Sequence, residues 1–525
     1  MSPRGVRAAR LAALSLYAGW GLLYIVRTSF YVAGQRAFCL WDDAMISMRY
    51  AKLFASGQGL VWNADGERVQ GFSNLGVTLV MALLHALPVD EFRISLVFQL
   101  LNLALLLAIL WLVYDVANRL FPGSPLVGLG ALLVTGLYGP LAIWGLQGSD
   151  VAPVCLVMLL ALRWTVTALR DGRDWPLGAF VLLAAGIVLR LDFAVVFAVF
   201  VAASLWLARR RWLCALVGLG ALLAACAAVM LFSWLYYGDP LPNSFYLKAT
   251  GHPRAVVLES GLRQTLALLA GPTALLLGAG GLGLLAFFRR DRLVWLLPAL
   301  IGALFAYNLW VGGDWNQQHV SRFLVPAAPL FFILWAGVCW RALARALGPA
   351  KLASPGARVG LLCLVLLACL ALQPRVAMRE WLDPRAQTLW KEYNRRNFAY
   401  GIYFRDHTAP ETTLALHWAG TIGYLSERRA VDVLGKSDRH IARLEVARFI
   451  PGHSKWDWDY VLSEHRPDVF RAASRGLEHR PDFTAGYYHV INRDGLGFFL
   501  RKDARDRLLD EEVQIVDQLT REPVR

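Results

Sequence analysis

Charged residues are scarce in this chain: Asp, Glu, Lys and Arg make up 17% of its 525 residues, while 57% are hydrophobic. A soluble domain rarely has this balance. The composition therefore excludes an ordinary soluble enzyme and indicates an α-helical protein with many membrane spans. Cysteine is also scarce, with 7 in all and none after Cys369. No zinc-binding spacing and no disulfide framework is present.

A phosphate-binding loop of the form Gly-x4-Gly-Lys-Ser/Thr is absent as well. The formal net charge of +15 would suit a nucleic-acid-binding protein. However, the arginines recur between apolar segments rather than forming one stripe, which is how membrane proteins mark their cytoplasmic loops. We therefore expect membrane lipids as surroundings and no nucleic acid as a partner.

The apolar segments predict about eleven transmembrane helices, most of them near the length that a bilayer requires. They run at about 11–32, 93–114, 125–143, 151–168, 176–189, 193–208, 212–236, 264–287, 292–311, 323–341 and 358–374. A further run at 72–88 is ambiguous. If it crossed the membrane, the later basic loops would change sides, so the positive-inside rule favours an interfacial position. The N-terminus is then cytoplasmic, and the polar loops and the C-terminal region are extracytoplasmic.

The composition changes near Gln373, where charged residues and proline become frequent. We therefore predict a transmembrane domain at 1–374, in which 33–92 form a first extracytoplasmic loop with interfacial helices. Residues 375–525 are then a C-terminal extracytoplasmic α/β domain. Within it, 413–417 and 487–500 have strand-like patterns, the second with a turn, and 503–519 suit a helix.

Two adjacent carboxylates, Asp42 and Asp43, stand just beyond the first apolar segment. Carboxylates at a membrane boundary are costly to hold near lipid, so they are more often functional than not. The alternative is that one of them only caps the following helix. The apolar residues of that helix recur at helical spacing, with Arg49 on the opposite face. We expect it to lie along the membrane surface.

The stretch Trp41–Asn74 resembles the first loop of the C-type (GT-C) polyprenyl-phosphate-dependent glycosyltransferases. It is closest to the bacterial arabinofuranosyltransferase branch, which includes mycobacterial terminal-arabinan and pilin-modifying enzymes. The resemblance continues in Tyr237–Lys248, Gly312–Trp315, Arg322–Phe323 and Asp438–Arg443. It implies an enzyme of the bacterial cytoplasmic membrane with an extracytoplasmic active site. The implied reaction is inverting transfer of a sugar, arabinofuranose by the nearest branch, from a polyprenyl-phosphate donor to a hydroxyl of a glycan or protein acceptor.

The resemblance makes Asp42 the general base, which takes the proton of the acceptor hydroxyl. Asp43 then caps the helix or holds another group of the site. The leaving phosphate needs cations, and the candidates are Lys248, Arg322, Arg190 and His319. Simpler roles stay open, since Lys248 can extend to the interface, Arg190 can pair with Asp192 and Arg322 can anchor a span.

The candidates for binding the sugar or the acceptor are Asp314, Trp315, Asn243, Trp62, Asn74 and His440. Trp62 equally suits the membrane interface. We assign no metal site and no certain cofactor, although metal dependence varies among GT-C enzymes and a divalent ion stays open. Two other functions are considered. A transporter or flippase of a lipid-linked sugar would place ionisable residues mid-membrane and show repeats, whereas a GT-C enzyme for a hexose or aminosugar would share these motifs.

Overall fold

The structure, a computed structural model, describes residues 3–123, 125–270, 272–314, 320–352, 354–471 and 474–524. It divides the chain into two compact units. The helical unit contains Met1–Arg27, Phe98–Leu231 and Arg254–Thr388; the mixed unit contains Thr28–Val97, Phe232–Pro253 and Leu389–Arg525. The predicted division into 1–374 and 375–525 separates segments that this structure places in one unit, namely the acidic-pair loop and the C-terminal residues.

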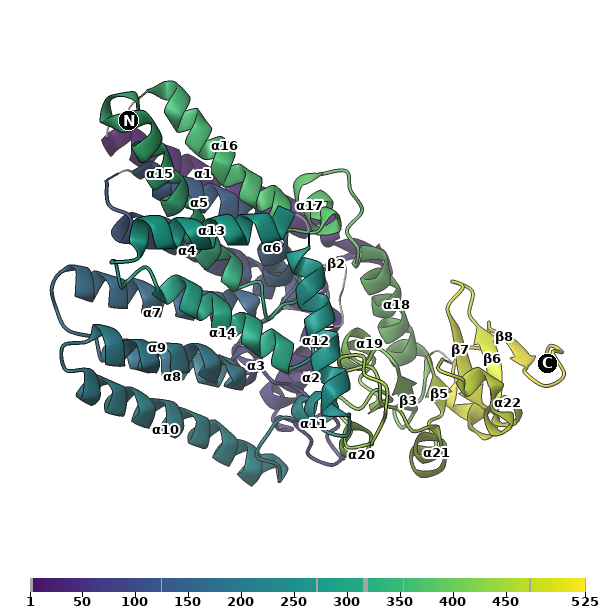
Figure 1. Ribbon diagram of the computed structural model, residues 1–525. Coiled ribbons are helices and arrows are strands. Elements are labelled where there is room, and N and C mark those ends of the chain that lie inside the picture. The colour runs from purple at the N-terminus through teal and green to yellow at the C-terminus, as the bar shows by residue number, and fades with distance from the viewer. Residues whose placement is uncertain are drawn as a thin grey trace. The chain divides into compact units, whose positions relative to one another are not determined.

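The helical unit consists of helices that lie side by side, and their labels can be followed in Figure 1. Neighbouring pairs include α7 with α8, α8 with α9, α9 with α14 and α14 with α15. The helices are α1 (Pro3–Thr28), α4 (Ile94–Leu120), α5 (Pro125–Leu137), α6 (Gly139–Leu146), α7 (Val151–Arg170), α8 (Gly178–Leu189), α9 (Ala194–Leu207), α10 (Arg211–Tyr237), α12 (Arg254–Leu269), α13 (Pro272–Phe288), α14 (Leu296–Trp310), α15 (Ala327–Leu352), α16 (Pro355–Leu372) and α17 (Arg375–Leu382).

Several of these helices are long and apolar enough to cross a membrane. Among the described residues there are 5 such helices, or up to 8 if each bent pair of helices is one span. Shorter apolar helices, among them α8, α9 and α14, accompany them. The predicted number of about eleven spans stays a prediction.

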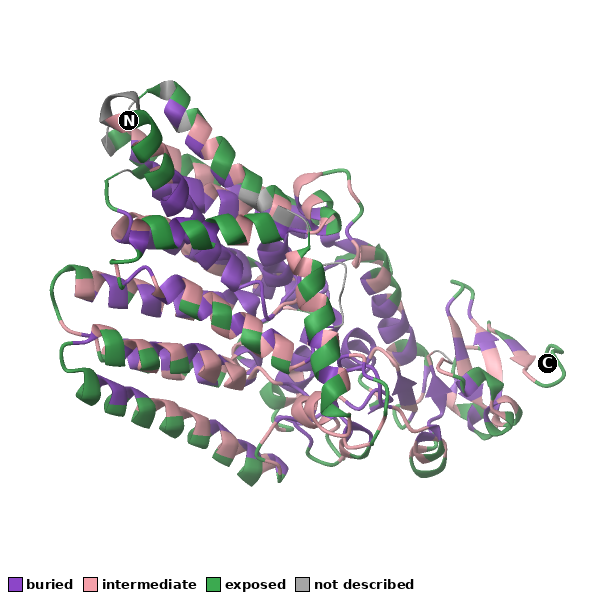
Figure 2. Ribbon diagram, in the orientation of Figure 1, coloured by how far each residue is buried: buried purple, intermediate pink, exposed green. Residues whose placement is uncertain are grey.

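The exposure of an apolar helix shows why these residues form a membrane unit. In the most apolar stretch of α15, 72% of the residues are buried, whereas in that of α10 only 17% are buried. Figure 2 accordingly shows α10 as largely exposed and intermediate along its length. An exposed apolar surface of this size is unstable in water and stable in hydrocarbon.

Helices α5 and α6 are separated by a bend of 58°. The bend lies next to Pro140, whose ring prevents α5 from continuing.

The mixed unit contains a six-stranded sheet in the order β4-β3-β5-β7-β6-β8. Strand β3 pairs in parallel with β4 and β5, and the other neighbours are antiparallel. A buried apolar cluster that includes Val431, Ile441 and Phe470 packs around the first three strands. The strands are β3 (Thr413–Leu416), β4 (Arg429–Asp432), β5 (Val469–Phe470), β6 (Tyr487–Ile491), β7 (Gly497–Arg501) and β8 (Gln514–Asp517).

The mixed unit also contains helices, most of them short. They are α2 (Asp42–Ala55), α3 (Leu75–His85), α11 (Asn243–Ala249), α18 (Lys391–His407), α19 (Gly420–Ser426), α20 (Arg439–Ala442), α21 (Trp458–Tyr460) and α22 (Pro481–Gly486). Helix α3 has 11 residues, a length of about 16 Å, which is too short for a bilayer core. A small hairpin of β1 (Phe30–Val32) and β2 (Gln35–Ala37) precedes α2.

Helix α2 is packed within the mixed unit, and its position along the membrane surface stays a prediction. Most residues of α2 are buried, and Arg49 is only 6% exposed. Its guanidinium donates to the backbone carbonyls of Trp62, Gly423 and Arg428, because a buried cation needs acceptors for all its donors. The helix is therefore a packed element of the unit.

The C-terminal predictions were partly confirmed. The strand at 413–417 and the two strands within 487–500 are present as β3, β6 and β7. The predicted helix at 503–519 was wrong, since a short 3-10 helix (Lys502–Arg507) and strand β8 occupy this stretch. Pairing of β8 with β6 determines the outcome, and sequence periodicity does not reveal such a partner.

Candidate active site

Asp42 begins α2 and is bound to the start of a second helix, α19. Its carboxylate accepts hydrogen bonds from the backbone N–H groups of Gly420 (3.2 Å) and Thr421 (3.0 Å). Residue 420 has to be glycine, because a Cβ there would collide with the carbonyl oxygen of Asp42. Asp42 is 4% exposed, and burial raises the pKa of its carboxyl group. A raised pKa makes this carboxylate a stronger base, which suits proton abstraction near neutral pH.

Asp43 forms an ion pair with Lys436, a residue that the sequence analysis missed. The distance from Lys436 Nζ to Asp43 Oδ1 is 2.5 Å. Burial lowers the pKa of Lys436, but the charges of Asp43 and Asp42 outweigh this effect, so the pKa is raised. This ion pair supports the role of Asp43 as the residue that holds another group of the site.

The loop that carries Lys436 runs from β4 to α20 and has a defined shape. The Asp432 carboxylate accepts from the backbone N–H groups of Leu434 (3.1 Å) and Ser437 (2.8 Å). Gly435 has a φ of 76°, in the left-handed region that favours glycine. Burial raises the pKa of Asp432 to about 6. These contacts fix the backbone from which the Lys436 side chain reaches the acidic pair.

Asn243, predicted to bind sugar or phosphate, supports this loop instead. Its side-chain amide donates to the backbone carbonyls of Gly435 (2.9 Å), Lys436 (3.2 Å) and Asp438 (2.9 Å). Asn243 is 3% exposed. Since its two N–H bonds are used by the loop, we correct the prediction: Asn243 positions Lys436.

His453 and Lys248 belong to the same group of side chains. The pKa of His453 is lowered to about 3 by burial and by the positive charges of Lys436 and Lys248, so the ring is neutral at pH 7. A Cβ on Gly452 would lie 3.2 Å from Cε of Lys248, which places the Lys248 stem beside residues 452–453. The predicted phosphate ligand Lys248 thus lies in the surroundings of the acidic pair.

Lys455, which no sequence pattern indicated, ties the Lys248 segment to the Lys436 loop region. It is fully buried, at 0% exposure. Its ammonium group donates to the backbone carbonyls of Ala442 (2.6 Å), Thr250 (2.8 Å) and Tyr246 (3.2 Å). The three donors of one lysine therefore hold α11 against α20.

We predict that Lys455→Met destabilises the mixed unit, because three buried carbonyls lose their donor. The expected loss is about 3 kcal/mol, since each hydrogen bond from a charged group contributes roughly 1.5–3 kcal/mol and the three are not additive. Thermal unfolding of the purified protein measures it. Lys52→Met is the control, because Lys52 pairs with exposed Glu427 and such pairs contribute less than about 1 kcal/mol. Equal unfolding temperatures for Lys455→Met and the wild type would contradict the prediction.

Trp62, a predicted sugar-binding residue of the mixed unit, has structural partners instead. Its side chain is buried, its Nε1 donates to the carbonyl of Ala430 (2.8 Å), and the Arg49 guanidinium covers its ring. These contacts leave no ring face for a sugar, so that prediction is corrected.

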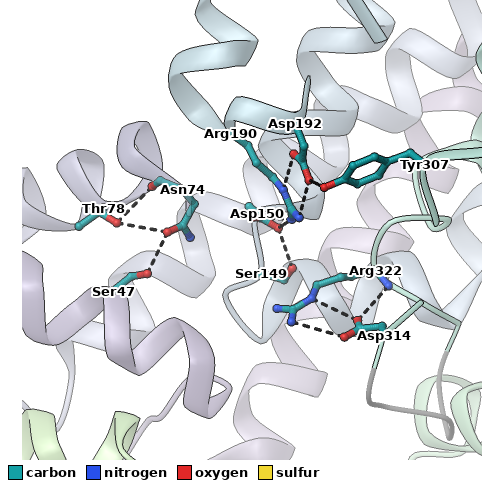
Figure 3. A network of polar contacts seen from close by, with 10 residues as sticks. All are labelled: Ser47, Asn74, Thr78, Ser149, Asp150, Arg190, Asp192, Tyr307, Asp314 and Arg322. Carbon is teal, nitrogen blue, oxygen red and sulfur yellow. Dashed lines mark hydrogen bonds and ion pairs between the residues drawn. The ribbon is translucent and has the colours of Figure 1, made fainter. Parts of the chain in front are cut away.

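Asn74 and His440 are also engaged. The Asn74 side-chain oxygen accepts from the hydroxyls of Ser47 (3.0 Å) and Thr78 (3.3 Å), as Figure 3 shows. His440 Nε2 lies 2.9 Å from the Asp457 carboxylate. The sugar-binding roles of these two residues stay predictions.

Arg190, a predicted phosphate ligand, is held by two carboxylates of the helical unit. Its Nη1 lies 2.8 Å from Asp150 and its Nε 2.7 Å from Asp192. Asp192 also accepts a hydrogen bond from the Tyr307 hydroxyl, and Figure 3 shows Arg190 reaching both acids. Two negative partners neutralise the guanidinium, so we remove Arg190 from the phosphate ligands. The pairing with Asp192 that the sequence left open is what the structure contains.

Arg322 and Asp314 form a second polar pair of the helical unit. The Arg322 Nε lies 3.1 Å from Asp314, and the backbone N–H of Arg322 also points to this carboxylate. Asp314 uses its charge on Arg322, which weakens its predicted role in sugar binding. The predicted residues Trp315 and His319 lie outside the described residues.

A cavity of about 510 Å³ opens among the helices of this unit. Its polar lining comes from Arg263, Gln264, Asn308, Ser321 and Gln373. A smaller apolar pocket shares several of its lining residues and extends among Tyr138, Leu277, Ile301, Phe305 and Phe331. The helical unit thus offers a polar opening that continues into an apolar interior.

The acidic pair does not fit a divalent metal well. Within the described ranges, no group of three His, Cys, Asp or Glu side chains comes close enough to hold an ion. Asp43 pairs with the Lys436 ammonium group, whose charge repels a second cation. We therefore derive no step through a metal.

The family comparison covers only part of the chain. Residues 386–512 match a family model described as a domain of unknown function (DUF8728). No curated protein matches the sequence.

Solved structures with a similar fold include two glycosyltransferases. The archaeal oligosaccharyltransferase AglB from Archaeoglobus fulgidus is 11% identical, and the alignment covers 97% of this chain and 75% of AglB at a TM-score of 0.56. ArnT from Cupriavidus metallidurans is 15% identical, with 95% and 98% coverage at a TM-score of 0.55. Arabinosyltransferase EmbB from Mycobacterium smegmatis, at 17% identity, 71% and 39% coverage and a TM-score of 0.37, is too dissimilar to inform the choice of sugar.

AglB and ArnT are GT-C glycosyltransferases, and the fold of this chain is the GT-C fold that the sequence resemblance implied. It combines apolar membrane helices with a sheet-containing C-terminal part.

Proposed function

We propose that this protein transfers a sugar from a polyprenyl-phosphate donor to an acceptor hydroxyl, with inversion at the anomeric carbon. The observation that carries the proposal is the buried carboxylate of Asp42 beside the ion pair of Asp43 and Lys436, within a GT-C fold. A single displacement needs a base for the hydroxyl and cations for the leaving phosphate. The AglB structure contains a dolichol-phosphate, which supports a lipid-phosphate donor.

In the proposed reaction, Asp42 takes the proton of the acceptor hydroxyl while the hydroxyl oxygen attacks the anomeric carbon. The bond from that carbon to the phosphate oxygen breaks, and its electron pair leaves with the phosphate. Each Asp42 oxygen has a lone pair beyond the one used by the backbone of α19. The base can therefore accept a proton without losing its attachment. Lys436 keeps the acidic pair ionised through its charge.

The donor tail has a suitable place in the helical unit. The 510 Å³ cavity has a polar opening and continues into the apolar pocket. A polyprenyl phosphate has the same division, with a charged head and a hydrocarbon tail. We propose that the tail occupies the apolar part. The sequence resemblance makes Arg322 a candidate phosphate ligand of this unit.

The sugar that we propose is arabinofuranose, because the motif segments are closest to the arabinofuranosyltransferase branch. The site is proposed to lie on the extracytoplasmic side of a bacterial cytoplasmic membrane, since the basic loops mark the opposite side. The test is incubation of the purified protein with polyprenyl-phosphate arabinofuranose, hexose or aminosugar donors, with released polyprenyl phosphate as the readout. Faster release from a hexose donor would overturn the sugar, and no release from any donor would overturn the reaction. Movement of an intact donor across proteoliposomes without release would instead indicate a flippase.

We predict that Lys248→Met raises the donor KM by roughly 10- to 100-fold, the loss expected for one hydrogen bond to a charged group. Arg322→Met should act in the same way. Donor and acceptor kinetics separate the two substrates, and a different acceptor should not rescue either variant. Lys52→Met removes the same charge from an exposed pair and should leave both constants unchanged. If the two variants keep normal donor kinetics and lose only acceptor binding, the phosphate assignment is wrong.

A further inference from the structure

Beside the acidic pair, the mixed unit contains aromatic and cationic side chains that the proposed reaction does not use. We name Tyr393, His417, Trp418, Arg471 and Arg475 the aromatic–cationic cluster. The ring centroids of Tyr393 and Trp418 are 5.3 Å apart, and those of His417 and Trp418 are 5.5 Å apart. These residues come from α18, from the end of β3 and from the segment after β5.

The cluster lies next to the proposed catalytic groups. The Trp418 ring is 5.7 Å from the ring of His453. Burial raises the pKa of Tyr393, and the negative charges of Asp42 and Asp43 raise it further. Tyr393 is therefore within electrostatic reach of the acidic pair, and Trp418 borders the histidine beside Lys436.

The arginines of the cluster lie over aromatic rings, whereas two later arginines of the chain pair with carboxylates. Arg480 pairs with two carboxylates and Arg501 also pairs with two. By contrast, the guanidinium of Arg471 lies over the Tyr400 ring, 4.7 Å from its centroid. That of Arg475 lies over the ring of a tryptophan at 4.4 Å. An aromatic face leaves the edge of a guanidinium, with its N–H donors, available to a ligand.

Buried polar atoms of the cluster have no hydrogen-bond partner. In the part of the chain that the structure describes, these atoms are Nε of Arg471 and Nε of Arg475. A buried donor without an acceptor is unfavourable by roughly 1–3 kcal/mol. Two such atoms in one cluster indicate an acceptor that comes from a ligand.

Several positive charges surround His417. Burial lowers the pKa of His417 to about 4, and the positive charges of Arg475, Lys436 and Arg471 contribute to the lowering. No carboxylate is among these causes. The Ser474 hydroxyl lies 3.3 Å from Nδ1 of the ring. A negative ligand would be attracted by the positive charges around His417.

We propose that the aromatic–cationic cluster binds a negatively charged acceptor, a sugar that carries a carboxylate or phosphate near the hydroxyl to be glycosylated. The inference rests on the proposed function, because it assigns the acceptor of that reaction. Trp418 and Tyr393 are aromatic side chains of the type that packs against sugar rings. Arg471 and Arg475 offer N–H donors in the fork geometry that suits a carboxylate or phosphate. The same chemistry would suit the phosphate of the donor, so the experiment has an arm for each source.

The test measures binding to the full-length protein in lipid nanodiscs, without donor and without turnover. Methyl β-glucuronide and methyl β-glucoside are the probes, since they differ only in the carboxylate, and tryptophan fluorescence reports binding at low salt. The wild type should bind the glucuronide about 10-fold or more tightly than the glucoside. Arg471→Gln and Arg475→Gln should each reduce this preference about 10-fold. Arg471→Lys and Arg475→Lys keep the charge and should retain part of it.

Arg480→Gln is the matched control, because it makes the same substitution at a paired arginine nearby and should leave the preference unchanged. Equal affinity for the two sugars in the wild type, or an unchanged preference in both Gln variants, would overturn the proposal. Farnesyl phosphate provides the donor arm. If its binding is lost in the Gln variants while glucuronide binding persists, the cluster belongs to the donor phosphate and the acceptor proposal fails. If the protein prefers the glucuronide but releases no polyprenyl phosphate from any donor, the anion-binding role of the cluster is supported and the proposed reaction is wrong.

Discussion

Asp42→Asn is expected to lower turnover by on the order of 100-fold or more, the contribution of a positioned general base. An amide cannot take the proton of the acceptor hydroxyl. Folding should persist, because the Asn oxygen can still accept one of the two N–H groups of α19, which Gly420 and Thr421 supply. The readout is the initial rate of polyprenyl-phosphate release, together with thermal unfolding of the same preparation.

Asp43→Asn distinguishes the two members of the pair. Asp43 is the partner of Lys436, and its side chain is 27% exposed, so the variant should lose less turnover than Asp42→Asn. A folded Asp42→Asn protein with near-normal turnover would show that Asp42 is not the general base. If Asp43→Asn alone abolished turnover, the base would be Asp43.

Features that the nearby sequence reveals could be predicted. The acidic pair follows an apolar segment and belongs to a recognisable loop, and the GT-C fold that this resemblance implied is the fold observed. Strands β3, β6 and β7 show in the pattern of β-branched and aromatic residues. These features depend on residues that are neighbours along the chain, and such neighbours are read directly from the sequence.

Residues whose role depends on a distant partner could not be predicted. Lys436 lies nearly 400 positions from Asp43, and nothing in its own segment marks it as a site residue. Asn243 and Arg190 have the residue types of ligands, but the structure uses them on a loop and on two carboxylates. A sequence gives the donors of a side chain and leaves open which acceptors occupy them.

The same reasoning explains why Trp62 was misassigned. An aromatic residue in a polar loop suits a sugar, the membrane interface and a buried core equally. The choice follows from Arg49, which covers the ring and brings its donors to three backbone carbonyls. Only the packing of α2 within the mixed unit shows this.

Lys436→Met is the second change with a large expected effect, a loss of turnover on the order of 100-fold at pH 7. The positive charge of Lys436 lowers the pKa of Asp42, against burial and the charge of Asp43, which raise it. Without this cation, the two neighbouring carboxylates lose a compensating positive charge, and one of them holds its proton more strongly. His453, a titratable neighbour of Lys436, has a pKa lowered to about 3 and supplies no positive charge at pH 7.

The sign of the pH dependence follows from this. The base must be ionised, so activity falls as the pH drops through the pKa of the acidic pair, and a higher pKa moves this fall to higher pH. The acidic limb of the kcat/KM profile of Lys436→Met should therefore lie at higher pH than that of the wild type, with part of the lost activity regained under alkaline conditions. Lys436→Arg, which keeps the charge, should retain the wild-type limb and serves as the control for folding. A uniform loss at every pH, with the limb unmoved, would show that Lys436 acts only through the shape of its loop.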